Sequence, residues 1–417
     1  MKKIYFLIAM VTATMLASCT KEQEDFFSDS SANRADATIA ADKKVLTSAA
    51  NGWLMKLYPD AQQSYGGYNV IVRFTEDGKA EVRGEYLGEI CTSLYSITQS
   101  AGIVLTFDTF NEEFHLFSDP AAPLGGDEGE GLGGDYDFSI MKATPEEVVL
   151  KGKKTGNRIV MTPMPNDDWE GYMDKVADVE YNMLSNFYQV KINNVEVPAS
   201  ISDRTLVFSF EEDGEEVEKQ ASYIVTPDGI EFYEPLEIMG ATMKGFKNGA
   251  DGALEFDESA GSGLKLEKVK LPEIELMANS QCYVAYSMLG ELAQQYWAAM
   301  AKAEAAVGES VGYAYFGFDN GQYTLTFYSS GYVGHFYFEF TPLSNDEVTL
   351  KVVGYDGNGQ WYYQNAGWNY AIQPFMGTFK LSSDNEYCPS VLILQDVEDP
   401  SNNIALSLST VYYPFNR

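Results

Sequence analysis

The chain has 417 residues, of which 45% are hydrophobic and 21% are charged, a balance typical of a folded protein and unlike that of a disordered chain. Its 61 acidic residues outnumber the 28 basic ones and give a net charge of −33, which excludes the basic footprint that a nucleic-acid partner requires. Aromatic residues make up 14%, and this richness favours β-strands, on whose pleated surface flat rings pack well.

The N-terminal residues 1–18 have the composition of an export signal peptide. Lys2 and Lys3 precede an apolar run over residues 4–17, which is shorter than the roughly 20 residues that a membrane span needs. The run ends in a Leu-Ala-Ser-Cys quartet that resembles the signal box of bacterial lipoproteins, in which the cysteine sulfur is acylated. We therefore predict that Cys19 is the lipid-attachment site and that acyl chains anchor the protein to a membrane. A plain secretory signal is the alternative.

Residues 19–35 are mostly polar and are predicted to form an acidic, flexible tether. Within the tether, Lys21 is followed directly by an acidic run, a pattern that resembles the surface-export signal of Bacteroidetes lipoproteins. The resemblance implies a lipid-anchored protein of the outer membrane that is displayed at the cell surface. The other interpretation is an ordinary polar tether.

Three amphipathic helices are predicted, the first over residues 36–58, the second opening at residues 166–168 and the third over residues 280–306. In each case apolar residues recur at the spacing of one helix face, and core packing is the simplest role for that face. The apolar positions that indicate these helices are Leu46, Ala50, Trp53 and Leu57; Trp169, Met173, Val176, Met183 and Phe187; and Leu289, Leu292, Tyr296 and Met300.

Short alternating strands and tight turns follow each predicted helix. Asp-Gly or Asn-Gly pairs that end at Gly78, Gly214 and Gly321 separate apolar runs. Such pairs favour hairpins because both of their residues tolerate positive φ angles. We therefore predict a repeated unit in which a helix precedes an antiparallel meander.

The pattern divides the chain into three predicted units, over residues 36–165, 166–270 and 271–417. Closing an antiparallel sheet into a barrel removes its unpaired edges. We therefore expect a mainly β protein with a few α-helices, built of tandem antiparallel lipocalin-like barrels that are each preceded by an amphipathic helix. A β-sandwich is the second choice of architecture for these units.

Two segments are candidates for binding. Residues 125–135 form an acidic, glycine-rich loop whose oxygen ligands suit Ca²⁺, but the loop lacks the spacing of an EF-hand, so a solvated loop is the preferred interpretation. Residues 361–370 concentrate aromatic and amide side chains, which can stack on sugar rings and bond hydroxyl groups, although core packing is the commoner role of such rings. The candidate ligand-binding residues are Trp361, Tyr362, Tyr363, Trp368 and Tyr370. A second candidate of this kind is the segment 64–68.

Cysteine and histidine are scarce. Beyond Cys19 the cysteines are Cys91, Cys282 and Cys388, whose wide and odd spacing argues against a disulfide framework and a zinc site. His115 and His335 each lie in an aromatic run and are predicted to occupy strand positions rather than to act as ligands or bases. We expect no cofactor, no metal and no catalytic residue.

Motifs in the N-terminal third resemble those of one family. These are the box at Cys19, Asn-Gly-Trp at residues 51–53, Gly-Gly-Tyr at 66–68, Phe-Ser-Asp-Pro at 117–120 and the Gly-Gly-Asp-Tyr-Asp-Phe run at 133–138. They are similar to an uncharacterised Bacteroidetes lipoprotein family encoded near SusC/SusD-type, starch-utilisation-like importers. The resemblance implies an envelope location and nutrient capture, and it carries over no catalytic residue.

These features together predict a surface-tethered, non-enzymatic lipoprotein that binds a nutrient, either a glycan or a peptide, for an outer-membrane uptake system. Two alternatives stay open. The first is a hydrolase that uses paired carboxylates, which cannot be selected from sequence among 61 acids. The second is a structural or adhesive protein of the cell surface.

Overall fold

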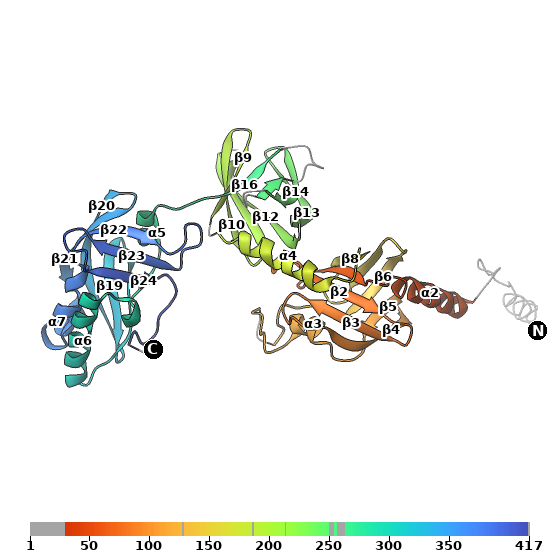
Figure 1. The fold of residues 1–417 in the computed structure, drawn as a ribbon, viewed down its shortest axis with the longest axis horizontal. Helices are drawn as coiled ribbons and strands as arrows, with labels where there is room; N and C mark the ends of the chain where they lie inside the picture. The colour runs from red at the N-terminus through yellow and green to blue at the C-terminus, as the bar shows by residue number, and fades with distance from the viewer. Residues whose placement is uncertain are drawn as a thin grey trace, which may run out of the picture. The chain divides into compact units, whose positions relative to one another are not determined.

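The chain folds into three closed antiparallel barrels that follow one another in sequence (Figure 1). The computed structural model describes residues 30–126, 129–185, 187–212, 214–249, 254–256 and 263–415. The predicted signal peptide and Cys19 lie outside these residues. Described residues up to Met173 form one compact unit and those from Asp174 onward form a second. The prediction of a mainly β protein with tandem antiparallel barrels, each preceded by a helix, is confirmed.

The first barrel follows helix α2 (Ser31–Leu46) and closes where β1 pairs with β8. Its strands are β1 (Trp53–Leu57), β2 (Tyr68–Phe74), β3 (Lys79–Gly84), β4 (Cys91–Ser100), β5 (Gly102–Phe107), β6 (Asp137–Ala143), β7 (Val148–Gly152) and β8 (Arg158–Pro163). Between β5 and β6 the chain forms the short helices α3 (Glu112–His115) and η1 (Leu116–Ser118).

Strand β2 is buried on both of its faces. Val70 and Val72 point into the barrel core, whereas Ile71 points outward into a separate apolar cluster with Trp169 and Met173. These last two residues belong to the first turns of helix α4 (Trp169–Asn182). The helix that opens the second sequence repeat therefore begins by covering the outside of the first barrel.

The second barrel follows α4 and closes where β9 pairs with β16. Arg204 forms a two-bonded ion pair with Glu180 of α4, with both N–O distances at 2.9 Å, which fixes the end of the helix to the turn before β11. The strands are β9 (Tyr188–Ile192), β10 (Val195–Ser202), β11 (Thr205–Glu212), β12 (Glu215–Thr226), β13 (Gly229–Ile238), β14 (Ala241–Asn248), β15 (Leu254–Phe256) and β16 (Lys265–Lys268).

The third barrel follows helix α5 (Glu273–Asn279) and closes where β17 pairs with β24. Its strands are β17 (Cys282–Tyr283), β18 (Val311–Asp319), β19 (Gln322–Ser329), β20 (Tyr332–Ser344), β21 (Glu347–Tyr355), β22 (Gly377–Ser383), β23 (Val391–Asp396) and β24 (Asn403–Ser407). Its remaining helices are η3 (Tyr286–Met288), α6 (Glu291–Ala306), α7 (Gly357–Asn365), α8 (Trp368–Ala371) and η4 (Gln373–Phe375). Figure 1 shows α6 and α7 beside the strands of this barrel.

The hairpins marked by Asp-Gly and Asn-Gly pairs are confirmed. Strand β2 pairs with β3, β11 with β12 and β18 with β19. At the last of these turns Asn320 and Gly321 both have positive φ angles, 49° and 79°, as a two-residue hairpin turn of this kind requires.

The first predicted helix is wrong in its second half. Helix α2 ends at Leu46, and Trp53 and Leu57 lie instead on β1. Gly52, directly before β1, adopts a φ of +91°, a backbone conformation that a continuing right-handed helix does not allow. The spacing that matched one helix face also matches alternate strand positions, because Trp53, Met55 and Leu57 all point into the barrel.

Three further local predictions are corrected. The second helix ends at Asn182, so Phe187 lies beyond it and is 41% exposed. The third is interrupted, because β17 occupies its predicted start and α6 begins only after Gly290. His115 ends helix α3 rather than lying in a strand, where its ring stacks on Tyr136.

The three barrels span residues 53–163, 188–268 and 282–407. The division into separate units over residues 36–165, 166–270 and 271–417 stays a prediction. Within the described residues, no helix combines the length and the apolar composition needed to cross a bilayer.

We expect Gly52→Ala to lower the stability of the first barrel. A Cβ at this position would lie 2.7 Å from the Trp169 ring, and the positive φ angle disfavours any L side chain, so we expect a loss of about 2 kcal/mol or more in unfolding free energy. Urea unfolding measures the change. Gly88→Ala is the matched control, because Gly88 also has a positive φ but faces open space. An equal loss in both variants would contradict the packing argument.

Candidate functional site

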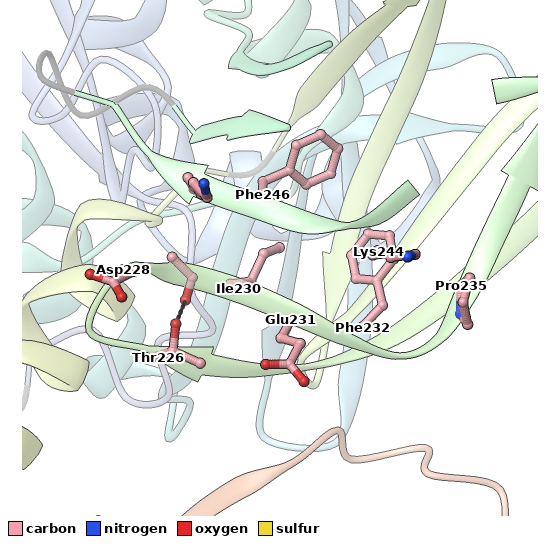
Figure 2. A pocket seen from close by; sticks show the side chains of 10 residues that line it. Thr226, Asp228, Ile230, Glu231, Phe232, Pro235, Lys244 and Phe246 are labelled. Atoms are coloured by element: carbon pink, nitrogen blue, oxygen red, sulfur yellow. Dashed lines mark hydrogen bonds between the residues drawn. The ribbon is translucent and has the colours of Figure 1, made fainter. Parts of the chain in front are cut away.

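A hollow of about 380 Å³ opens on the second barrel, where the pairing of β13 with β14 is interrupted between Glu231 and Leu236. Figure 2 shows its side chains, which come from these two strands, the end of β12 and the turn that follows it. The charged and aromatic side chains in its lining are those of Asp228, Glu231, Phe232, Lys244, Phe246 and Lys247. Because the lining mixes two carboxylates, two ammonium groups and two rings, its charge selects no class of ligand.

A buried polar cluster lies at the C-terminal end of α6 in the third barrel. The carboxyl of Glu304 is 1% exposed and accepts hydrogen bonds from the Ser329 hydroxyl at 2.8 Å and the Trp368 indole N–H at 3.1 Å. A carboxylate oxygen of Glu309 accepts a hydrogen bond from the Tyr362 hydroxyl at 2.8 Å. The Ser329 hydroxyl oxygen lies 3.4 Å from the same Glu309 oxygen. One serine hydroxyl therefore stands within reach of two carboxyl groups.

Both acids also line a hollow of about 220 Å³ beside the C-terminal residues Tyr413 and Phe415. Burial raises the pKa of Glu304, although the hydrogen bonds from Ser329 and Trp368 oppose the shift. Two carboxyl groups that share one hydroxyl are a candidate for the paired carboxylates of the hydrolase alternative. The oxygens of Glu304 are directed into the core, so the cluster ties α6, α8 and β19 together.

The structure divides the predicted ligand segment 361–370. Tyr362 and Trp368 are buried in the core and use their polar atoms on the two acids of this cluster. Trp361 and Tyr370 are 44% and 46% exposed, and Tyr363 packs partly against the core. The segment forms α7 and α8 rather than one continuous face, and its role in binding a ligand stays a prediction.

The second predicted segment contributes mainly to the first barrel. Tyr68 lies in the core with its ring centroid 4.9 Å from that of Phe117, and Tyr65 packs against the same core. The Ser64 hydroxyl donates to Asp60. These contacts account for the three side chains without a ligand.

The acidic loop 125–135 is held by its own packing where it is described. Asp135 is buried and accepts hydrogen bonds from the backbone and hydroxyl of Thr155 and from the backbone of Lys154. Asp127 and Glu128 lie outside the described residues. Across the part of the chain that the structure describes, no three acidic, histidine or cysteine side chains gather in a way that could hold a metal ion.

The cysteines and histidines of the described chain take different positions. Cys91, Cys282 and Cys388 form no disulfide among the described residues, and of the three only Cys282 is buried. Burial raises the pKa of the Cys282 thiol to about 12, so it stays protonated and behaves as a small apolar side chain. His335 lies on β20 with its Nδ1 2.9 Å from a carboxylate oxygen of Asp356.

A cluster of tyrosines lies on the outside of the third barrel, which we call the tyrosine face: Tyr283, Tyr313, Tyr315, Tyr328 and Tyr412. Tyr283 and Tyr315 are cross-strand partners on β17 and β18 with ring centroids 5.2 Å apart. Tyr313 and Tyr328 are partners on β18 and β19, 5.4 Å apart and 11° from parallel. The rings of Tyr313 and Tyr315 are 6.2 Å apart, which joins the two pairs into one surface.

The tyrosine face has polar atoms to offer a ligand. Of its five hydroxyls, only that of Tyr283 hydrogen-bonds a described residue, Gln281, at 2.8 Å. Partial burial, together with the surrounding tyrosines, raises the pKa of Tyr313, so its hydroxyl remains a hydrogen-bond donor at neutral pH. Tyr328 is 36% and Tyr412 is 67% exposed.

Sequence reasoning missed this face, although a signal exists in retrospect. Tyr313 and Tyr315 alternate with Ala314 and Phe316. Both sides of this strand are therefore apolar or aromatic, and alternation alone does not predict which side faces the core. The hydroxyl groups on one of these faces are the remaining hint, since phenolic oxygens favour a wet environment.

The model of a family described as Domain of unknown function (DUF4302) matches residues 23–249, more than half of the chain. The protein therefore belongs to this family. The match ends before the third barrel, which carries the tyrosine face. No curated protein matches the chain.

Solved structures match with low scores. The β subunit of DNA polymerase from Streptococcus pyogenes is 10% identical over 88% of this chain and 92% of its own, with a TM-score of 0.13. The polymerase sliding clamp of Caulobacter crescentus is 11% identical over 90% and 98%, with a TM-score of 0.11. The Aeromonas veronii immune modulator A is 6% identical over 88% and 98%, with a TM-score of 0.15. These scores carry no conclusion about fold or function.

We expect Glu304→Gln to change how stability depends on pH. A carboxyl whose pKa is raised in the folded state holds its proton more tightly there than in the unfolded chain. Its contribution is present below the unfolded pKa and is lost as pH rises through the folded pKa. The stability of the variant relative to the natural protein should therefore increase as the pH rises above the unfolded value of about 4.5.

Calorimetric unfolding at a series of pH values measures this difference. Glu291→Gln is the control, because Glu291 lies exposed in the first turn of the same helix. A difference between the Glu304→Gln variant and the natural protein that stays constant across the pH range would contradict the assignment of a raised pKa.

Proposed function

We propose that this DUF4302 protein is a non-enzymatic lipoprotein, anchored through Cys19 in the outer membrane and displayed at the cell surface, that binds a nutrient glycan or peptide for an uptake system. The anchor rests on the export-like residues 1–18 and the small residues directly before the cysteine. The surface location rests on the acidic run after Lys21. The importer as partner rests on the family resemblance of the N-terminal motifs.

The observation that carries the binding role is the tyrosine face. Five adjacent rings with four unengaged hydroxyls among the described residues are an unusual use of a barrel exterior, since tyrosines clustered in this way mark recognition surfaces. The face contains no carboxylate, histidine or cysteine, so it offers stacking and hydrogen bonding rather than acid–base chemistry. A binding role suits that chemistry better than turnover does.

We expect Cys19→Ala to abolish membrane anchoring. Without a thiol at this position no acyl chain can be attached, and the acidic chain, with its net charge of −33, has no attraction to anionic lipid. Fractionation of cells measures the distribution, and intact mass of the natural protein should show acylation of a chain that starts at Cys19. Cys388→Ala is the control, because it removes a cysteine that lies outside the predicted signal box and forms no disulfide among the described residues. An unmodified natural chain that still begins at Met1 would overturn the anchor.

We expect a deletion strain to grow more slowly on one class of nutrient, and the natural gene but not the Cys19→Ala gene to restore growth. Surface labelling of intact cells with an antibody tests display in the same strains. Growth that is unchanged on every glycan and peptide source would favour the structural or adhesive alternative. Turnover of a glycan by the purified protein, abolished by Glu309→Gln, would favour the hydrolase alternative.

A further inference from the structure

We propose that the tyrosine face is the binding site for an uncharged glycan chain, whose sugar rings stack on the tyrosine rings of β17, β18 and β19. This inference rests on the proposed function and names the ligand class and the site. A sugar ring has an apolar face of C–H groups and a rim of hydroxyls. A tyrosine ring matches both parts, because it presents an apolar face and a polar tip.

The rings form one surface across three strands. Cross-strand pairing places Tyr283 beside Tyr315 and Tyr313 beside Tyr328, and the period of two places Tyr313 and Tyr315 on the same side of β18. Centroid separations of 5.2, 6.2 and 5.4 Å leave no room for another side chain between neighbouring rings. The Tyr313 and Tyr328 rings are only 11° from parallel, so they cover part of each other's faces. An extended chain of sugars therefore meets the uncovered parts of several rings and their hydroxyl tips in succession.

The surface is held in place before any ligand arrives. The Tyr328 ring lies across Gly312, where a Cβ would come within 2.7 Å of its Cδ1 atom. The C-terminal segment is fixed by a hydrogen bond from the backbone N–H of Tyr413 to the Gly312 carbonyl and by the packing of Phe415 on Trp297. This places the Tyr412 ring edge-on to Tyr313, 6.4 Å away. A preorganised surface loses little entropy when it binds.

The charge distribution favours an uncharged ligand. The accessible positions of the face on β18 and β19 are Tyr313, Tyr315 and Tyr328, none of which is charged, whereas Gly317, Thr324 and Thr326 on the same side of these strands are buried. The chain as a whole has a net charge of −33, which repels polyanions. A cationic ligand would need acids within the face, and its five tyrosines supply none.

The topology favours a glycan over an extended peptide. Peptides commonly bind β proteins by adding a strand to an open sheet edge. Here β17 pairs with β18 at Tyr315 and Phe316 and with β24 at Ser407. The carbonyls of Ala314 and Gly312 accept hydrogen bonds from the backbone N–H groups of Val284 and Tyr413, so the edge of β18 is occupied at these positions. Side-chain stacking is then the interaction that remains, and it does not require backbone pairing.

The test uses the full mature chain without its acyl groups. Affinity electrophoresis and calorimetry measure its binding to xylan, soluble starch, mixed-linkage β-glucan and mannan as uncharged probes, to polygalacturonate as an anionic probe, and to a mixed tryptic digest as the peptide probe. We expect binding to at least one uncharged polysaccharide and none to polygalacturonate.

Three variants test the site. Tyr313→Ala and Tyr328→Ala should each weaken the binding at least about tenfold, whereas Tyr313→Phe should retain most of it because the ring is kept. Tyr412→Ala removes a ring outside the barrel strands, so it keeps the test valid if the other substitutions impair folding. The control is Tyr181→Ala, which removes a tyrosine that is 74% exposed on α4 and should bind like the natural protein.

Each contrary outcome has a separate meaning. Glycan binding that survives both Tyr313→Ala and Tyr412→Ala would overturn the site and leave the proposed function standing. Binding to the peptide digest alone would overturn the ligand class. A loss in Tyr313→Phe equal to that in Tyr313→Ala would overturn stacking as the interaction. No binding to any probe, together with normal growth of the deletion strain, would overturn the proposed function as well.

Discussion

The alternation of side chains along a β-strand governs the third barrel, because closure gives each strand one side in the core and one side in contact with its surroundings. On β18 and β19, Ala314, Phe316, Leu325 and Phe327 fill the interior. Their neighbours in the sequence must then point outward, and several of these are tyrosines. The same rule that packs the core thus creates the tyrosine face. A shift of one residue in register would exchange the two sets and bury the phenolic hydroxyls without partners.

Closed barrels and their hairpins were predictable because the signals are local. A turn such as Asn320-Gly321 encodes positive φ angles in two adjacent residues, and no distant contact is needed to interpret it. The first helix was not predictable to its end, because Trp53 and Leu57 fit one helix face and one strand face equally well. The deciding contacts come from elsewhere in the chain, such as the Trp53 indole N–H donating to the Leu46 carbonyl and the pairing of β1 with β8.

The binding residues were harder to predict than the fold, since exposure is a property of the whole barrel. Composition drew attention to residues 361–370, yet Tyr362 and Trp368 serve a buried carboxyl cluster. Burying Glu304 in an aromatic core requires donors around it, and tyrosine and tryptophan supply both donors and apolar bulk. An aromatic-rich segment in sequence therefore indicates either a ligand surface or the surroundings of a buried polar group, and only the position of its partners decides which.

Ring contacts within the tyrosine face explain how an exposed aromatic surface can be stable and still available. Each ring is partly covered by its neighbours, which reduces the apolar area in contact with water before a ligand binds. The same contacts restrict the side-chain rotamers, so that the entropy of ordering is lost on folding rather than on binding. Because the phenolic tips of Tyr313, Tyr315 and Tyr328 stay free of described partners, the surface keeps hydrogen-bonding capacity at its rim. An uncharged ligand with flat apolar faces and many hydroxyls uses both properties at once.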